Sequence, residues 1–136
     1  MKAAEYLERI RQLDEKINRK TRMAERWRQM AYSVPANTTK PHYGGTRATS
    51  ASFERCIEKA DVLEKEITAD IDSFIDLKLE AEEKIGMIPD ETCQEILRLR
   101  YLDLLKWHDV EAAVNMSHTH VFRKHREALV QLEEII

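Results

Sequence analysis

The sequence contains Cys93-Gln94-Glu95-Ile96-Leu97-Arg98-Leu99-Arg100-Tyr101, then Trp107-His108-Asp109-Val110, then Asn115-Met116-Ser117-His118-Thr119-His120-Val121. The first segment is typical of an amphipathic helix and the second of a short helix. The third is typical of a tight turn followed by a helix that Ser117 caps. Helices joined in this way form a helix-turn-helix, in which the last helix enters the major groove of DNA. We therefore predict such a domain in residues 87–136.

Individual residues support this prediction. Asn115 stands where these motifs often place glycine, because the position needs a positive φ, and asparagine is the best substitute. Asp90 and Ser117 are expected to cap the first and last helices. Arg98 and Arg100 are expected to be solvated or to reach toward phosphate. The residues expected to face the core are Ile96, Leu97, Leu99, Tyr101, Leu102, Trp107, Val110, Val114, Met116, Val121, Ala128, Leu129 and Leu132.

The outer side of the last helix supplies the candidate DNA contacts. We expect Arg123 to read guanine O6 and N7, and Thr119 to contact a thymine methyl group or a phosphate. Lys124 and Arg126 are expected to approach backbone phosphates. Free N–H groups at the start of the helix also favour an anion. The full set of expected DNA-binding residues is Ser117, His118, Thr119, His120, Phe122, Arg123, Lys124 and Arg126. A three-helix packing unit with an incidental basic tail is the alternative interpretation.

Two longer helices are expected before this domain, in residues 3–31 and 52–85. Their apolar residues recur every seven positions, which is typical of a coiled coil. Lys20 interrupts one row. Ser33-Val34-Pro35 is expected to end the first helix, because proline disfavours a helical conformation in the residue before it. The rows are Tyr6, Leu13 and Trp27; Ile10, Ile17, Ala24 and Ala31; Phe53, Ala60, Ile67, Phe74 and Ala81; and Ile57, Ile71 and Ile85.

The ends of the second helix have their own signals, with Ser52 as the expected N-cap and Gly86 as the expected residue after its last turn. Each long helix would measure roughly 45–50 Å. Residues 33–52 between them are rich in Thr, Ser, Gly and Pro, without periodicity, and we expect a mobile loop there, either disordered or with a binding role. The predicted fold is thus all-α: a long antiparallel, coiled-coil-like hairpin in residues 1–86, followed by a small helix-turn-helix domain in residues 87–136.

Composition narrows the function classes. The chain has 136 residues, of which 43% are hydrophobic and 35% charged, and a formal net charge of −3. This charge argues against a general nucleic-acid coat protein. Residues 1–32 hold nine Lys or Arg against five Asp or Glu, whereas residues 53–85 hold five against eleven. The opposite charges favour pairing of the two long helices. We find no apolar run of membrane-spanning length and no secretory signal, and we expect a cytoplasmic protein with no membrane partner.

Little in the sequence supports metal binding or catalysis. His118 and His120 are two residues apart, so they face different ways on a helix, and no cysteine or acid completes a zinc site with His125. Ser117 already has a capping role, and the acidic residues follow solvated helix faces. Cys56 and Cys93 lack metal-binding spacing and are expected to be free, buried thiols. We expect no catalytic residue, no metal, no cofactor and no enzyme activity.

The C-terminal residues also resemble a known family. Residues 88–132 are similar to region 4 of bacterial sigma-70 factors, through Glu95-Ile96-Leu97-Arg98-Leu99-Arg100-Tyr101 and through Trp107, Val110, Ser117, Val121, Arg123 and Ala128-Leu129. The whole chain resembles small phage-encoded late transcription regulators of the ArpU and RinA type. Two positions depart from the pattern: Glu111 stands where alanine is usual, and Lys124 where an apolar residue is usual.

The resemblance implies a phage transcription regulator in the host cytoplasm. Its partners would be double-stranded DNA and host RNA polymerase, and the long helices would dimerise or dock on the polymerase. A homodimer is expected because the seam of Ile10, Ile17, Phe53, Ile67 and Phe74 is more apolar surface than a lone hairpin covers. A helical interaction protein that binds a host protein without DNA, favoured by Glu111 and Lys124, and a packaging protein like the small terminase subunits remain as alternatives.

Overall fold

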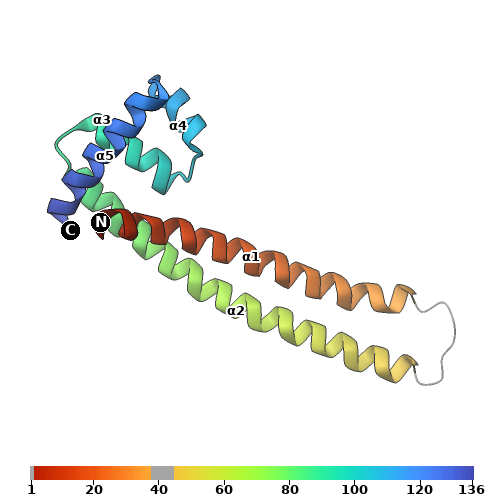
Figure 1. Ribbon diagram of the computed structural model, residues 1–136. Helices are drawn as coiled ribbons and strands as arrows, with labels where there is room; N and C mark the ends of the chain where they lie inside the picture. The colour runs from red at the N-terminus through yellow and green to blue at the C-terminus, as the bar shows by residue number, and fades with distance from the viewer. Residues whose placement is uncertain (1, 38–44) are drawn as a thin grey trace. The chain divides into compact units, whose positions relative to one another are not determined.

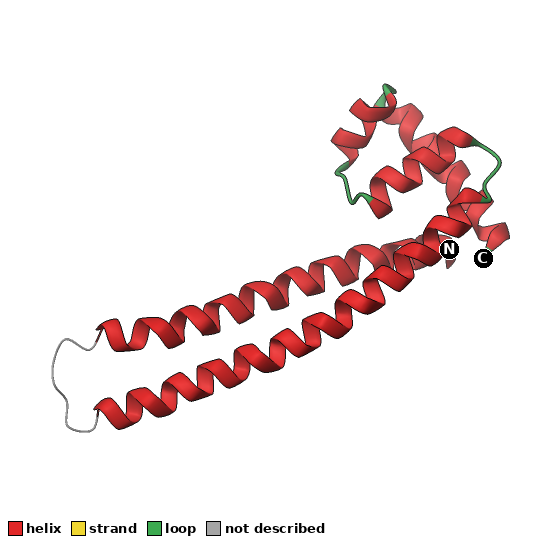
Figure 2. Cartoon of the chain, turned by 180° about the vertical axis from the view of Figure 1, so that it is seen from behind, coloured by secondary structure: helices red, strands yellow, loops and turns green. Residues whose placement is uncertain are grey.

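The structure is a computed structural model that describes residues 2–37 and 45–136. The described residues form helices and no strands, which confirms the predicted all-α fold (Figure 1). Figure 2 shows the same helices from behind, with short loops between the helices that follow α2. None of these helices combines the length and the apolar character that a bilayer crossing requires. The element order is α1 (Lys2–Asn37), α2 (Gly45–Gly86), α3 (Glu91–Leu97), the π-helix η1 (Arg98–Leu102), α4 (Trp107–Val114) and α5 (His118–Ile135).

The two long helices extend further than predicted. α1 continues through Pro35 to Asn37, and α2 begins at Gly45, so Ser52 is not its N-cap. The free-energy cost of these extensions is small. A proline near the end of a long helix removes one hydrogen bond, and a serine or threonine in a helix destabilises it by only a few tenths of a kcal/mol relative to alanine. The expected loop at 33–52 is therefore wrong for residues 33–37 and 45–52, and its residues 38–44 lie outside the described part. Gly86 ends α2 without a positive φ.

The chain divides into two compact units, each built from parts of α1 and α2. The hairpin unit is Glu15–Asp72, and the C-terminal unit is Met1–Asp14 with Ser73–Ile136. The end of the predicted hairpin domain at residue 86 coincides with the end of α2. The compact C-terminal unit, however, also includes the first turns of α1 and the last turns of α2.

In the hairpin unit, the predicted apolar rows face the neighbouring helix. Ala24, Ala31 and Ala60 are buried, and Ile17 and Ile67 are half-buried. Lys20, which interrupts one row, donates from Nζ to Asp70 Oδ2 at 2.8 Å. The break in the apolar pattern therefore corresponds to an ion pair between α1 and α2. Of the predicted rows, Ile71 is a departure, because 39% of its surface is exposed.

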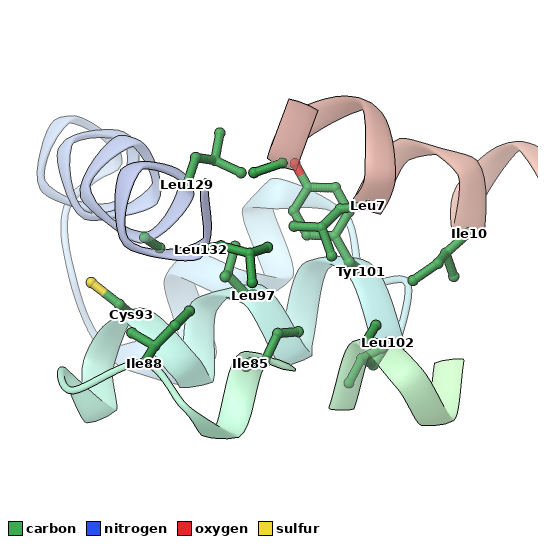
Figure 3. Close-up of a cluster of buried hydrophobic side chains, with 13 residues drawn as sticks. Leu7, Ile10, Ile85, Ile88, Cys93, Leu97, Tyr101, Leu102, Leu129 and Leu132 are labelled. Atoms are coloured by element: carbon green, nitrogen blue, oxygen red, sulfur yellow. The ribbon is translucent and has the colours of Figure 1, made fainter. Parts of the chain in front are cut away.

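In the C-terminal unit, the main core joins both ends of the chain. Figure 3 shows Leu7 of α1, Tyr101 of η1 and Leu132 of α5 pointing toward one another. Burying these side chains holds α3, η1 and α5 against the first turns of α1 and the last turns of α2. The buried members are Ala3, Leu7, Ile10, Ala81, Ile85, Ile88, Cys93, Leu97, Tyr101, Leu102, Ala128, Leu129 and Leu132.

A second, smaller cluster lies under the helix-turn-helix. Ile96, Val110 and Val121 are fully buried and come from α3, α4 and α5. Trp107, Val114 and Met116 are half-buried around them, with Leu99 and Leu105. The residues predicted to face the core therefore all belong to these two clusters.

Candidate nucleic-acid interface

The turn between α4 and α5 has the predicted geometry. Asn115 lies in the left-handed region, with φ 53° and ψ 50°, and its N–H bonds to the Ala112 carbonyl. The Ser117 hydroxyl accepts a hydrogen bond from the His120 N–H at 3.3 Å. A short polar side chain tolerates the left-handed conformation, and the serine satisfies a donor that the helix leaves free. Together they set the direction in which α5 leaves the turn.

α3 begins in the same way. The Asp90 carboxylate accepts hydrogen bonds from the N–H groups of Thr92 and Cys93, at 2.9 and 3.3 Å. The helix then passes into the π-helix η1, where the Asp103 N–H donates to the Arg98 carbonyl. The wider turn of a π-helix shifts the side chains that follow it. Two consecutive residues of η1, Tyr101 and Leu102, are buried in the main core.

Three predicted contact residues share the exposed side of α5. Thr119, Arg123 and Arg126 are exposed, and their spacing of four and three residues places them on one helix face. Neither arginine forms an ion pair with any residue of the described chain. A shallow hollow of about 450 Å³ beside them is lined by Arg123, Arg126, Glu127, Val130 and Gln131. This face of α5 can therefore accept hydrogen-bond acceptors and anions from outside the chain.

An acidic side chain, that of Glu111, contacts the first residue of α5. His118 is exposed, and its Nδ1 lies 3.2 Å from Glu111 Oε2. Glu111 is one of the departures from the sigma-like pattern, and its side chain contacts His118 at the start of α5 instead of turning away. His120, also predicted to contact DNA, is half-buried. The histidines at this end are less available to a ligand than Arg123.

Phe122 has a different position from the one we expected. Its ring centroid lies 4.7 Å from that of Trp107 and 4.5 Å from that of His118, and the side chain is half-buried. The ring therefore packs between α4 and α5 rather than on the outer side of α5. The burial of aromatic surface against Trp107 explains this orientation.

Lys124 is engaged within the chain. Its Nζ donates to Asp90 Oδ2 at 3.0 Å and lies 3.3 Å from Glu127 Oε2. The hydrogen bond to Asp90 and then that to Glu127 raise the pKa of Lys124, while Lys124 lowers the pKa of Asp90. In this arrangement the ammonium group holds α5 against the N-cap of α3, so a phosphate contact by Lys124 would require it to leave Asp90 and Glu127.

The two arginines of η1 also have partners within the chain. Arg98 Nε donates to Glu82 Oε1 at 2.9 Å. The Arg100 guanidinium lies 4.7 Å from the Trp107 ring centroid and donates to the Leu105 carbonyl. Burial, and then the charge of Arg11, lowers the pKa of Arg100. Arg100 is thus engaged within the chain, so the expectation that it is solvated or reaches phosphate is wrong. Arg98 keeps a side chain that is 37% exposed, with Glu82 as its surface partner.

His125 was not predicted as a functional residue, and it has the most perturbed surroundings on α5. Its Nε2 lies 2.9 Å from the Tyr101 hydroxyl, and its ring packs edge-on against Trp107. Burial, followed by the charge of Arg100, lowers the pKa of His125 to about 4. The imidazole is therefore neutral near pH 7 and belongs to the packing between the helices. Its spacing of four residues from Val121 places it on the inner side, which is a signal the sequence does contain.

One cluster has the composition of a metal site. Donor atoms of Asp90, Cys93 and Glu127 lie within 4.8 Å of one another. Burial raises the pKa of the Cys93 thiol to about 11, so in the chain without a metal the thiol is protonated at neutral pH. The Lys124 ammonium already contacts both carboxylates. The two carboxylates thus share one ammonium partner, with the neutral Cys93 thiol beside them. Cys56 and Cys93 are free, buried cysteines, as predicted.

Comparison with known proteins places the chain in a family. No curated protein and no solved structure matches it. A family model matches residues 35–133, which covers most of the chain, including α2 and the whole helix-turn-helix. The chain belongs to the family described as "Protein of unknown function (DUF1492)".

Proposed function

We propose that the protein binds double-stranded DNA through α4 and α5 and acts as a transcription regulator. One observation carries the proposal: Thr119, Arg123 and Arg126 form an exposed face of α5, and both arginines lack an ion pair within the described chain. The turn at Asn115 and the cap at Ser117 present this face as in a helix-turn-helix. Such a helix reads base edges in the major groove, where each base pair shows a distinct pattern of donors and acceptors.

The residues of α5 would have separate roles. Arg123 lies one turn beyond Thr119, and its guanidinium would donate two hydrogen bonds to guanine O6 and N7. Arg126 would bind a backbone phosphate, which positions the protein without reading sequence. The free N–H groups at the start of α5 would bind a second phosphate. Lys124 and Phe122 have no part in this interface, because both are engaged inside the C-terminal unit.

The regulatory role is of the kind that small phage-encoded regulators perform, with host RNA polymerase as a protein partner and the host cytoplasm as location. The long helices would dimerise or dock on the polymerase. The seam first expected to drive dimerisation is buried or half-buried within the monomer. The remaining support is the exposed apolar side chains of α2, among them Val62, at 58%, and Leu79, at 64%. Static light scattering tests this: a monomer mass at micromolar concentration would exclude the dimer.

The DNA proposal is tested by selecting binding sites from a random duplex library with the full chain. Titration on the selected duplex and on a scrambled one then compares the parent with single variants. Arg123→Ala should weaken binding to the selected duplex by about tenfold or more and relax the preference at one position. Arg126→Ala should weaken both duplexes equally. Arg9→Ala, which removes an exposed arginine from α1 of the same unit, is the matched control and should leave binding unchanged.

A helical protein that binds another protein without DNA is the second candidate. It is favoured by the pairing of Lys124 with Asp90 and of His118 with Glu111, because these contacts leave few cations on α5. If the library yields no enriched duplex, with or without RNA polymerase, the DNA proposal is wrong and this candidate replaces it. A ring of many subunits in the light-scattering experiment would instead favour a packaging protein.

A further inference from the structure

The cations of α1 in the hairpin unit divide into two sets. One set faces α2 and is paired with its acids. Lys16 Nζ and Lys20 Nζ lie 3.9 and 2.8 Å from the Asp70 carboxylate. Arg28 Nη2 lies 3.1 Å from Asp61 Oδ1 and 2.7 Å from Glu64 Oε1. Part of the positive charge of α1 is thus paired with part of the negative charge of α2.

The other set is Arg19, Arg22 and Arg26, which we call the arginine ridge. All three side chains are exposed, and none has a carboxylate within ion-pair distance in the described chain. Their spacing of three and four residues places them on one face of α1. At a rise of about 1.5 Å per residue they are separated by roughly 4.5 and 6 Å along the helix axis. The ridge is therefore a continuous row of positive charge that the hairpin unit does not neutralise.

The chemistry of the ridge fits phosphate. The guanidinium group of arginine presents planar, paired donors that match the oxygens of a phosphate. Duplex DNA has one negative charge per about 1.7 Å of its axis, so a ridge of roughly 10 Å would meet several phosphates in any register. Glu15 and Glu25 are the acids in the same stretch of α1, and neither pairs with the ridge. An acidic protein partner would need carboxylates arranged to match the three arginines, whereas any DNA sequence supplies the phosphates.

The recognition helix α5 also offers few unpaired positive charges for DNA binding. Lys124 pairs with Asp90 and Glu127, so Arg123 and Arg126 are the cations of α5 that have no ion pair within the described chain. Two phosphate or base contacts supply little of the electrostatic free energy on which protein–DNA affinity depends. A second basic surface would supply the remainder.

We propose that the arginine ridge is a second DNA-binding surface, which contacts the phosphate backbone without reading sequence. The inference rests on the proposed DNA binding by α5. It predicts that the affinity of the full chain for duplex DNA depends on α1 as well as on the helix-turn-helix. Sequence preference depends on α5 alone.

The test is a salt titration of the full chain on the selected duplex and on a scrambled one. The triple variant Arg19→Ala, Arg22→Ala, Arg26→Ala should bind both duplexes at least tenfold more weakly at low salt. The plot of log K against log[salt] should become shallower by about 2.7, which is about 0.9 for each lost phosphate contact. The matched triple substitution by lysine keeps the charge and should retain most of the slope. Circular dichroism checks that the helices of each variant remain folded.

The experiment tests the ridge proposal and the α5 proposal separately. If the alanine triple variant keeps the parent's slope and affinity, the ridge proposal is wrong, while a loss of preference in Arg123→Ala would still support α5. If the triple variant loses affinity and Arg123→Ala and Arg126→Ala have no effect, the ridge binds DNA and the proposed role of α5 is wrong. If the parent binds no duplex at low salt, both are wrong. Binding of poly-glutamate that depends on the ridge, with unchanged duplex binding, would assign the ridge to an acidic protein instead.

Discussion

The Glu133 carboxylate on the last turns of α5 accepts hydrogen bonds from the backbone N–H groups of Lys2 and Ala3, at 3.3 and 2.7 Å. These are N–H groups of the first turn of α1, which the helix itself cannot satisfy. A negative charge there also interacts favourably with the helix dipole. Glu133 thus caps a helix 130 residues away in the sequence and holds the start of α1 against the end of α5 within the C-terminal unit.

Replacing this cap should destabilise the protein. Glu133→Ala leaves the two N–H groups without an acceptor and should lower the free energy of unfolding by about 1 kcal/mol, as for other lost caps. Glu133→Gln keeps an acceptor oxygen and should cost less. Urea denaturation followed by circular dichroism measures both. The neighbouring Glu134 is exposed, so Glu134→Ala is the control. Equal losses from Glu133→Ala and Glu134→Ala would contradict the capping role.

The left-handed turn residue supports a second prediction. Asn115 has φ 53°, a conformation that β-branched residues adopt at a cost of roughly 1–2 kcal/mol. Asn115→Val should therefore destabilise the protein by about that amount, whereas Asn115→Gly should be neutral within about 0.5 kcal/mol. Denaturant midpoints of the two variants provide the comparison. If valine and glycine had the same effect, the backbone at this turn would not be under the proposed constraint.

His125 should make stability depend on pH. Its pKa falls from 6.5 to about 4 on folding, because burial disfavours the charged imidazolium. Above pH 6.5 the group is neutral in both states, so its full contribution is present. Between pH 6.5 and 4 the unfolded chain binds a proton that the folded chain excludes, and stability falls as the pH falls. Lys124 lowers the pKa of Asp90 on folding, so protonation of this carboxylate causes a further loss of stability below pH 3.8, its ordinary pKa.

The variant His125→Gln isolates the histidine contribution, since glutamine fills a similar space and does not titrate. Thermal midpoints of the parent and the variant should converge as the pH decreases from 7 to 4, because the parent alone loses stability through this group. His120→Gln, on the same helix, is the control. Parallel midpoint curves for the parent and His125→Gln would show that the imidazole does not exclude the proton.

Much of the fold could be predicted because its signals are local. The caps at Asp90 and Ser117 and the turn at Asn115 depend on hydrogen bonds and φ values within a few residues. The apolar periodicity predicted which faces of the helices are buried. The ends of α1 and α2 were less predictable, because the helices continue through residues of low helix propensity. Leu104, with φ 58°, gave no signal at all. Its half-buried side chain packs against the main core, which compensates for the unfavourable backbone conformation.

The candidate site was harder to predict, because the availability of a charged side chain depends on distant partners. Lys124 and Arg126 look equivalent in the sequence. In the structure Lys124 is paired with Asp90, 34 residues earlier in the chain, and Arg126 has no ion pair among the described residues. The guanidinium group of Arg100 is likewise engaged inside the chain, where it lies over the ring of Trp107. Such pairings follow from the packing of different helices against one another, which spacing along one helix cannot reveal.

The contrast between Lys124 and Arg126 is itself testable. Lys124→Ala removes the ammonium group that pairs with both Asp90 and Glu127, so the urea midpoint should fall, and fall less in high salt, which screens the remaining repulsion. Its DNA affinity, measured where the variant is folded, should keep the parent's salt dependence. Arg126→Ala should do the opposite: the urea midpoint should be unchanged, and the plot of log K against log[salt] should become shallower by about 0.9, as for one lost phosphate contact. An equal loss of slope in Lys124→Ala would show that this side chain leaves Asp90 to bind phosphate when DNA is present.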